Sequence, residues 1–140
     1  MSKLVYSYNK IHKIIHNSID KILEFKPDII LAIGGGGLIP ARIIRSYIDV
    51  NIEIITIKTY DDEIQTNKIN IIQWTDNNYI DKKVLIVDEI DDTGNTLKYC
   101  IDKLQKNNNL NNYCVYVVHN KLKKKKYNKS EIKNYLNGEI

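Results

Sequence analysis

The sequence is poor in the residues that mark several protein classes. It has two cysteines, two prolines and one tryptophan among 140 residues. Cys100 and Cys114 both lie inside apolar stretches, which excludes a disulfide-rich secreted scaffold and predicts buried free thiols in a reducing compartment. No apolar run approaches the about 20 residues that a transmembrane helix needs, and the first residues lack a signal-peptide core. We therefore expect a cytoplasmic protein with no membrane association.

Positive charge is concentrated at one end of the chain. The formal net charge is +4, but residues 119–140 contain seven lysines and two acidic residues, whereas residues 1–118 are close to neutral. The lysine-rich end matches no nucleic-acid-binding module, so we interpret it as a solvated tail and expect no nucleic-acid partner. With 43% hydrophobic residues, a chain of this length is expected to form one globular domain.

Apolar spacing predicts strands alternating with helices. Residues 8–25 repeat apolar positions at threes and fours, as one face of a helix does. The other segments read as helices at 38–45 and 96–106 and as strands at 28–33, 51–59, 84–87 and 113–118. Such alternation implies right-handed crossovers and a mostly parallel sheet with ligands at the carboxyl ends of its strands. The loops at 34–37, 88–96 and 119–121 would then meet at one edge.

Carboxylates are crowded directly after the strand at 84–87. Asp88, Glu89, Asp91 and Asp92 fall within five positions, and Thr93-Gly94-Asn95-Thr96 follows them. Carboxylates this close repel one another unless a cation or donor hydroxyls sit among them. A helix start rich in hydroxyls and amides suits a phosphate group. The stretch therefore predicts a site for a molecule with sugar hydroxyls and a phosphate, with a plain turn carrying surface acids as the alternative.

Four consecutive glycines follow the strand at 28–33. Gly34, Gly35, Gly36 and Gly37 would let backbone amides approach an anion closely, and Pro40 suits the first turn of the next helix. The spacing matches neither the Walker pattern nor a dinucleotide-binding fingerprint. On its own, the run indicates either an anion-binding loop or an ordinary turn.

Two further pairs of residues support weaker hypotheses. His12 and His16 lie four apart, a spacing that can hold a metal on one helix face, but no acidic or cysteine partner accompanies them, so surface or capping roles are the simpler interpretation. Arg42 and Arg45 either add positive field beside the glycine run or form a solvated helix face.

These segments together resemble the type I phosphoribosyltransferases. The sequence VLIVDEIDDTGNTL at 84–97 is similar to the motif with which that family binds phosphoribosyl pyrophosphate (PRPP). IGGGGLIPAR at 33–42 and Gln73-Trp74 resemble the fungal-type hypoxanthine-guanine and xanthine enzymes. The resemblance implies a single-domain α/β fold with a core at 1–121. It also implies a flexible loop at 60–80 that closes over PRPP, with short strands and Trp74 at its base, and a lysine-rich tail or truncated hood at 122–140.

The resemblance also implies roles on the PRPP side of the site. Asp88 and Glu89 would hold the ribose hydroxyls and Mg²⁺, the ion being bound through water or PRPP. The four glycines, 34–37, would bind pyrophosphate. The 5′-phosphate would be held by Thr93, Gly94, Asn95 and Thr96. No role is implied for Asp91.

On the base side, the resemblance points to two residues. Asp92 matches the position that accepts a proton near N7 of the purine. Lys121 would contact the exocyclic oxygen of a 6-oxopurine, unless it merely begins the basic run that follows.

We therefore expect an enzyme of purine salvage that transfers the 5-phosphoribosyl group of PRPP to a purine base, with 6-oxopurines favoured, and releases pyrophosphate. The expected cofactor is Mg²⁺, and the expected assembly is a homodimer or larger homo-oligomer. The alternative is a non-catalytic PRPP- or nucleotide-binding regulatory protein of the same fold. Intact Asp92 favours the enzyme, whereas a C-terminus that stops before the base-covering segment of purine relatives favours the binder.

Overall fold

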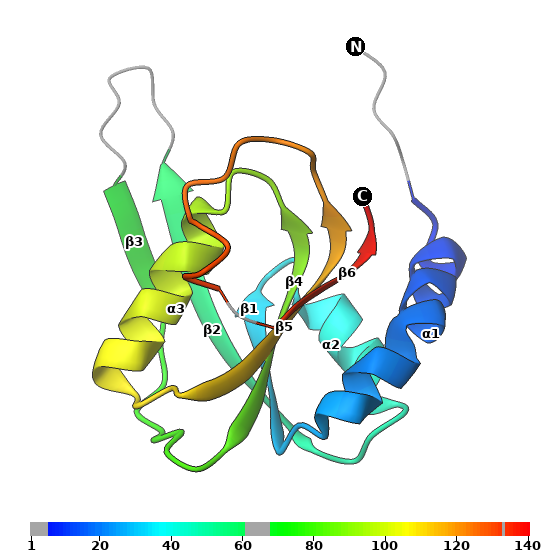
Figure 1. Cartoon of the computed structure of the whole chain (residues 1–140), viewed down its shortest axis with the longest axis horizontal. Helices are drawn as coiled ribbons and strands as arrows, with labels where there is room; N and C mark the ends of the chain where they lie inside the picture. Colours follow the sequence, from blue (N-terminus) through cyan, green and yellow to red (C-terminus); the bar gives the residue numbers. More distant parts are fainter. Residues whose placement is uncertain (1–5, 61–67, 133) are drawn as a thin grey trace.

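A six-stranded sheet with helices on both faces organises the chain (Figure 1). The computed structural model describes residues 6–60, 68–132 and 134–140. Its elements, in chain order, are α1 (Tyr8–Phe25), β1 (Ile29–Gly34), α2 (Leu38–Arg45), β2 (Asn51–Tyr60), β3 (Lys68–Gln73), β4 (Lys83–Asp91), α3 (Asn95–Asn107), β5 (Asn112–Asn120) and β6 (Tyr135–Glu139). No helix among the described residues is both long and apolar enough to cross a bilayer.

The strand order is β3-β2-β1-β4-β5-β6. Strands β1, β2, β4, β5 and β6 run parallel, and only the β2–β3 pair is antiparallel. This arrangement confirms the predicted mostly parallel sheet. Because β1, β4 and β5 are neighbours and run the same way, their carboxyl ends lie at one edge of the sheet.

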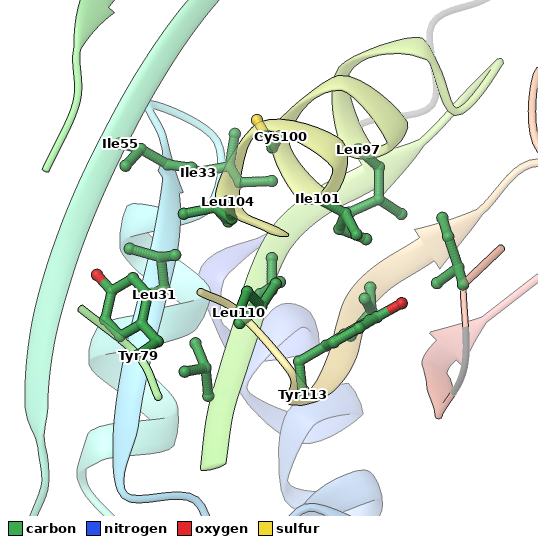
Figure 2. Packing of buried hydrophobic residues seen from close by; sticks show 14 of the residues in the cluster. Leu31, Ile33, Ile55, Tyr79, Leu97, Cys100, Ile101, Leu104, Leu110 and Tyr113 are labelled. Atoms are coloured by element: carbon green, nitrogen blue, oxygen red, sulfur yellow. The ribbon is translucent and has the colours of Figure 1, made fainter. Parts of the chain in front are cut away.

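Alternating strand residues fill two core layers. Helix α3 packs Leu97, Ile101 and Leu104 against one face, together with the buried Tyr79 (Figure 2). Helices α1 and α2 cover the opposite face, where Leu85 and Val87 of β4 are fully buried. Cys100 and Cys114 are buried free thiols, one in each layer, as the sequence predicted.

Two of the strands whose carboxyl ends meet at this edge, β4 and β5, are longer than the sequence predicted. Strand β4 continues to Asp91 and β5 to Asn120, and these two residues pair across the sheet. The acidic residues were interpreted as part of a turn, but Asp88, Glu89 and Asp91 belong to the strand. Pairing with β5 extends the strand past its apolar run, so the carboxylates stand on the rigid sheet.

The C-terminal segment contributes a strand that the sequence did not predict. Residues 135–139 form β6, which pairs in parallel with β5 at the sheet edge. Gly138 lies against Ile14 of α1 so closely that a Cβ would collide with it. The interpretation of this end as a solvated tail did not anticipate β6. The division into a core at 1–121 and a reduced hood at 122–140 stays a prediction.

Strands β2 and β3 form the base of the loop predicted at 60–80. Residues 61–67 of that loop lie outside the described residues. Trp74 follows β3 and packs against the core, while its indole Nε1 donates to Asn108 Oδ1 at 3.0 Å. This position agrees with the interpretation of Trp74 as a packing residue at the base of the loop.

Candidate active site

The carboxyl ends of β1, β4 and β5 bring the predicted site residues together. The glycine run leaves β1, the acidic residues end β4, and Lys121 follows β5. Gly36 and Glu89 are direct neighbours, because a Cβ on Gly36 would stand 2.8 Å from Glu89 Oε2. The glycine run and the acidic stretch therefore share one site, as the topology predicted.

The two leading carboxylates differ in their environment. Asp88 is partly buried, and its Oδ1 accepts a hydrogen bond from the backbone amide of Glu89 at 2.7 Å. Burial raises the pKa of Asp88 from 3.8 to about 7, against the lowering effect of that hydrogen bond. Glu89 is exposed. The pair thus offers one carboxylate that holds a proton readily and one that faces solvent beside the glycine run.

The start of α3 forms a small cavity of about 170 Å³. It is lined by residues of the motif, among them Thr93, Gly94, Asn95 and Thr96, with Asp88 and Asp92. Gly94 has a φ of 82° and faces the Tyr127 ring, so both its backbone conformation and its surroundings require glycine. The first amides of a helix lack partners within the helix and attract anions, so this cavity suits a phosphate group.

Asp92 lies in a strongly basic setting. Its carboxylate is 2.7 Å from Lys123 Nζ and 3.8 Å from Lys121 Nζ. Lys123, followed by the nearby charges of Lys121 and Lys125, lowers the pKa of Asp92 below its usual value. Asp92 is therefore ionised at neutral pH. The structure brings Asp92 and Lys121 together, and it adds Lys123, which the sequence did not single out.

Two larger cavities adjoin these residues. One of about 610 Å³ is lined by Glu89, Ile90, His119 and Lys121, and one of about 350 Å³ by Gly35, Gly36 and the same Glu89 and His119. Tyr6 lines both cavities, with its ring 4.3 Å from that of His119. Together they connect the glycine run with Lys121.

The sequence analysis assigned no role to several residues of this region, although two of them lie in the predicted loops 88–96 and 119–121. Ile90 sits at a variable motif position, and His119 carries no motif of its own; only its place at the end of a strand on the functional edge could have indicated it. Tyr6 precedes the first helix, and no sequence pattern marked it as a site residue. Its ring reaches the site through the packing of the chain before α1.

Asp91, to which no role was assigned, is 2% exposed and is held by residues of the C-terminal segment. Its Oδ2 accepts hydrogen bonds from the hydroxyls of Tyr127 at 2.6 Å and Tyr135 at 2.7 Å. Lys125 Nζ lies 3.5 Å from its Oδ1. Asp91 therefore fastens the segment after β5 to the end of β4.

The weaker hypotheses find no support as binding sites. His16 Nδ1 lies within hydrogen-bond distance of the Tyr47 hydroxyl, at 3.0 Å, and the described residues contain no group of three or more potential metal ligands. Arg45 pairs with Asp49, and Arg42 donates to Ser46. Both arginines thus make local contacts near the end of α2 instead of reaching the glycine run.

Comparisons with known proteins agree with this geometry. The phosphoribosyl transferase domain family matches residues 5–139. The hypoxanthine-guanine phosphoribosyltransferase of Schizosaccharomyces pombe is 38% identical over 88% of this chain and 75% of that protein. Its namesake in Saccharomyces cerevisiae is 35% identical over 89% of this chain and 72% of that protein.

Solved structures show the same fold. A hypothetical protein from Neisseria gonorrhoeae with bound ppGpp superposes with a TM-score of 0.82 at 34% identity, covering 99% of this chain and 84% of that one. The purine phosphoribosyltransferase of Pyrococcus horikoshii gives a TM-score of 0.83 at 26% identity, covering 100% and 89%. The resemblance inferred from the motifs is confirmed: this chain belongs to the phosphoribosyltransferase family.

Proposed function

We propose that this chain transfers the 5-phosphoribosyl group of PRPP to a purine base and releases pyrophosphate. Relatives that are 35–40% identical are named hypoxanthine-guanine and xanthine phosphoribosyltransferases, which supports a purine acceptor and a role in salvage. The observation that carries the proposal is the position of an ionised Asp92 beside Lys121. Both lie at the same edge of the sheet as the phosphate-sized cavity that residues 93–96 line.

On the PRPP side, each group has a binding partner in this proposal. The 5′-phosphate binds to Thr93, Gly94, Asn95 and Thr96, and the ribose hydroxyls bind to Asp88 and Glu89. The backbone amides of 34–37 bind the pyrophosphate, whose negative charge grows as it departs. Holding sugar and base in line is the protein's main contribution, because reactants held in position avoid the entropy cost of meeting.

On the base side, Asp92 accepts the proton that the purine loses when its ring nitrogen attacks C1. Asp92 is ionised at neutral pH, as a proton acceptor must be, but the lysines that lower its pKa also make it a weaker base, so its position beside Lys121 carries this role. Lys121 donates to the oxygen at position 6 of the base. An ammonium has donors only, so it favours a 6-oxopurine over adenine, which presents an amino group there.

We also propose Mg²⁺ as the cofactor, held by Asp88 and Glu89 together with PRPP. Both carboxylates stand beside Gly36 of the glycine run that would bind pyrophosphate, an arrangement that suits an ion bound by one or two carboxylates and substrate oxygens. The raised pKa of Asp88 fits as well, because a cation would displace the proton that burial favours. When bound, the ion would offset negative charge on the pyrophosphate.

The test is an assay of pyrophosphate release with PRPP, Mg²⁺ and each of hypoxanthine, guanine, xanthine and adenine. We expect turnover with at least one 6-oxopurine and much less with adenine. An adenine preference would contradict the role of Lys121. No turnover with any base, together with tight nucleotide binding, would contradict the enzyme and support the regulatory alternative.

A second candidate is nucleotide binding for regulation. A hypothetical protein from Neisseria gonorrhoeae, 34% identical to this chain, was solved with bound ppGpp, and we propose that such a nucleotide regulates this site in addition to catalysis. In this chain the phosphate cavity and the glycine run are the proposed contacts for such a ligand. Competition between ppGpp and PRPP is then expected in a binding assay, and simultaneous binding of both would contradict a shared site.

The assembly remains a proposal as well. We propose a homodimer or larger homo-oligomer, and the exposed Ile71 and Ile72 on edge strand β3 support association through apolar contacts. Sedimentation equilibrium would decide it, and a monomer at micromolar concentration would contradict it.

A further inference from the structure

Lys125 turns back into the molecule, although its neighbours Lys124 and Lys126 are exposed. Its side chain is 15% exposed. Its ammonium donates to three backbone carbonyl oxygens, those of Asp91 at 2.9 Å, Asp92 at 2.7 Å and Lys121 at 2.9 Å. An ammonium has three N–H donors, so these bonds use all of them.

A buried cation requires compensation, and Asp91 supplies it. The Asp91 carboxylate lies 3.5 Å from Lys125 Nζ and is itself held by the hydroxyls of Tyr127 and Tyr135. The ion pair is therefore fixed on both sides by hydrogen bonds, the condition under which a buried pair is tolerated.

The three carbonyls belong to two neighbouring segments of the active site, the end of β4 with the loop that follows it and the loop after β5. Asp91 and Asp92 precede α3, whereas Lys121 follows β5. The backbone also joins these loops, through Lys121 N to Asp91 O at 3.0 Å and Lys126 N to Thr93 O at 2.7 Å. Without the ammonium, the Asp92 carbonyl would lose this donor, and the carbonyls of Asp91 and Lys121 would keep only the backbone amides of Lys121 and Lys123. The three oxygens would then repel one another across the vacated point, which weakens the connection between the loops.

We propose that Lys125 is a positioning residue that fixes the distance between Asp92 and Lys121 by binding the backbone of both loops. The inference rests on the proposed function, because it takes Asp92 and Lys121 as the groups that contact the base. Lys125 does not line the 610 Å³ cavity beside Lys121. It acts through its neighbours, and its loss should affect the base more than PRPP.

Two variants distinguish the effect of the three hydrogen bonds to carbonyls from the effect of the positive charge alone. Lys125→Met keeps most of the side-chain stem and removes the donors. Lys125→Arg keeps the charge, but the planar guanidinium cannot direct three donors at one convergent set of carbonyls. Lys124→Met is the matched control, because it removes the same charge from the next, exposed position.

Steady-state kinetics give the first readout. We expect Lys125→Met to lower kcat/KM for the base about 10- to 100-fold, since small displacements of positioned groups have effects of this size. The KM for PRPP should change much less, and Lys125→Arg should stay impaired. Full activity in Lys125→Met, complete rescue by Lys125→Arg, or an equal loss in Lys124→Met would each overturn the proposal.

Hydrogen exchange gives a readout that needs no turnover. In Lys125→Met we expect faster exchange of the Lys121 and Lys126 amides, which bond to Asp91 O and Thr93 O, with unchanged protection in the strands at 29–34 and 84–87. Unchanged exchange at those amides would overturn the proposal. If Lys125→Met loses protection throughout the protein, the substitution has destabilised the whole fold, and Lys125→Arg decides instead. The same local increase in exchange at the Lys121 and Lys126 amides is expected in that variant. An inactive wild-type protein would contradict the proposed function and leave this measurement decisive for Lys125.

Discussion

Lysines that fold over Asp92 from the segment after β5 stabilise its negative charge. Lys123 is 2.7 Å away and Lys121 is 3.8 Å away, and together they hold the pKa of Asp92 below its usual value. Asp92 is therefore ionised at neutral pH, and it is a weaker base than an aspartate without these lysines.

Asp92→Asn keeps the size of the side chain and removes its ability to accept a proton. We expect kcat to fall by about 10²- to 10⁴-fold, the usual contribution of general acid–base catalysis. PRPP affinity should stay nearly unchanged, because Asn keeps the size of the side chain that lines the phosphate cavity and the glycine run is untouched. Asp20→Asn on the exposed side of α1 is the control. Equal turnover in Asp92→Asn would remove the residue from the mechanism.

Lys123→Gln tests how Asp92 keeps its charge. Removing the ammonium should raise the pKa of Asp92 toward its usual value. Activity requires the carboxylate, so the acidic limb of the kcat/KM profile should move to higher pH, with a small change near neutrality. Profiles extended down to about pH 2.5 would show this, because both limbs lie at or below the usual pKa of 3.8. An unshifted limb, or an equal shift in Lys124→Gln, would contradict it.

Individual residues were predictable where a local motif marks them. Asp92 and Lys121 follow strands at recognisable positions, and the structure places them side by side. The partners of Asp91 were not predictable, because Tyr127 and Tyr135 lie 36 and 44 residues later in the chain. Such contacts depend on how the whole C-terminal segment folds back, which local spacing does not encode.

Among the elements, the turn between β1 and α2 contains one glycine with no space for a side chain and one with ample space. A Cβ on Gly37 would collide with the carbonyl of Val87 and lie 2.7 Å from that of Ile33, whereas a Cβ on Gly35 meets nothing within 4 Å. Four identical residues in the sequence thus have different structural requirements.

Gly37→Ala and Gly35→Ala form a matched pair. We expect Gly37→Ala to lower the free energy of unfolding by about 1–3 kcal/mol, as overpacking against backbone does. Gly35→Ala should stay within about 0.5 kcal/mol of the wild type. Urea denaturation would measure both, and equal effects of the two substitutions would contradict the difference between these positions.

At the end of β4, Asp88→Asn tests the cost of burying a carboxylate. The native pKa of Asp88 is about 7, above its usual 3.8, so between these values the native state holds more protons than the unfolded state. Wild-type stability should therefore fall as pH rises through this window, while the variant lacks that loss. Without ligand, we expect the variant to be more stable by about 2–4 kcal/mol above pH 7 and similar near pH 4. A pH-independent difference would contradict the assignment.

For the whole molecule, hydrophobic periodicity was sufficient to predict alternating elements and a functional edge. Helix α1 was predicted over its full length, since one strong apolar face defines it. Strand β6 was not predicted, because its five residues are half-buried and follow a lysine-rich stretch that resembles a tail. Its existence depends on pairing with β5, a long-range contact.

The most direct test of the central claim is a crystal structure with a 6-oxopurine nucleoside 5′-monophosphate. The account predicts that the phosphate lies at residues 93–96, the ribose hydroxyls face Asp88 and Glu89, and Asp92 and Lys121 both contact the base. A nucleotide bound elsewhere, or bound here with its phosphate away from the start of α3, would contradict the account.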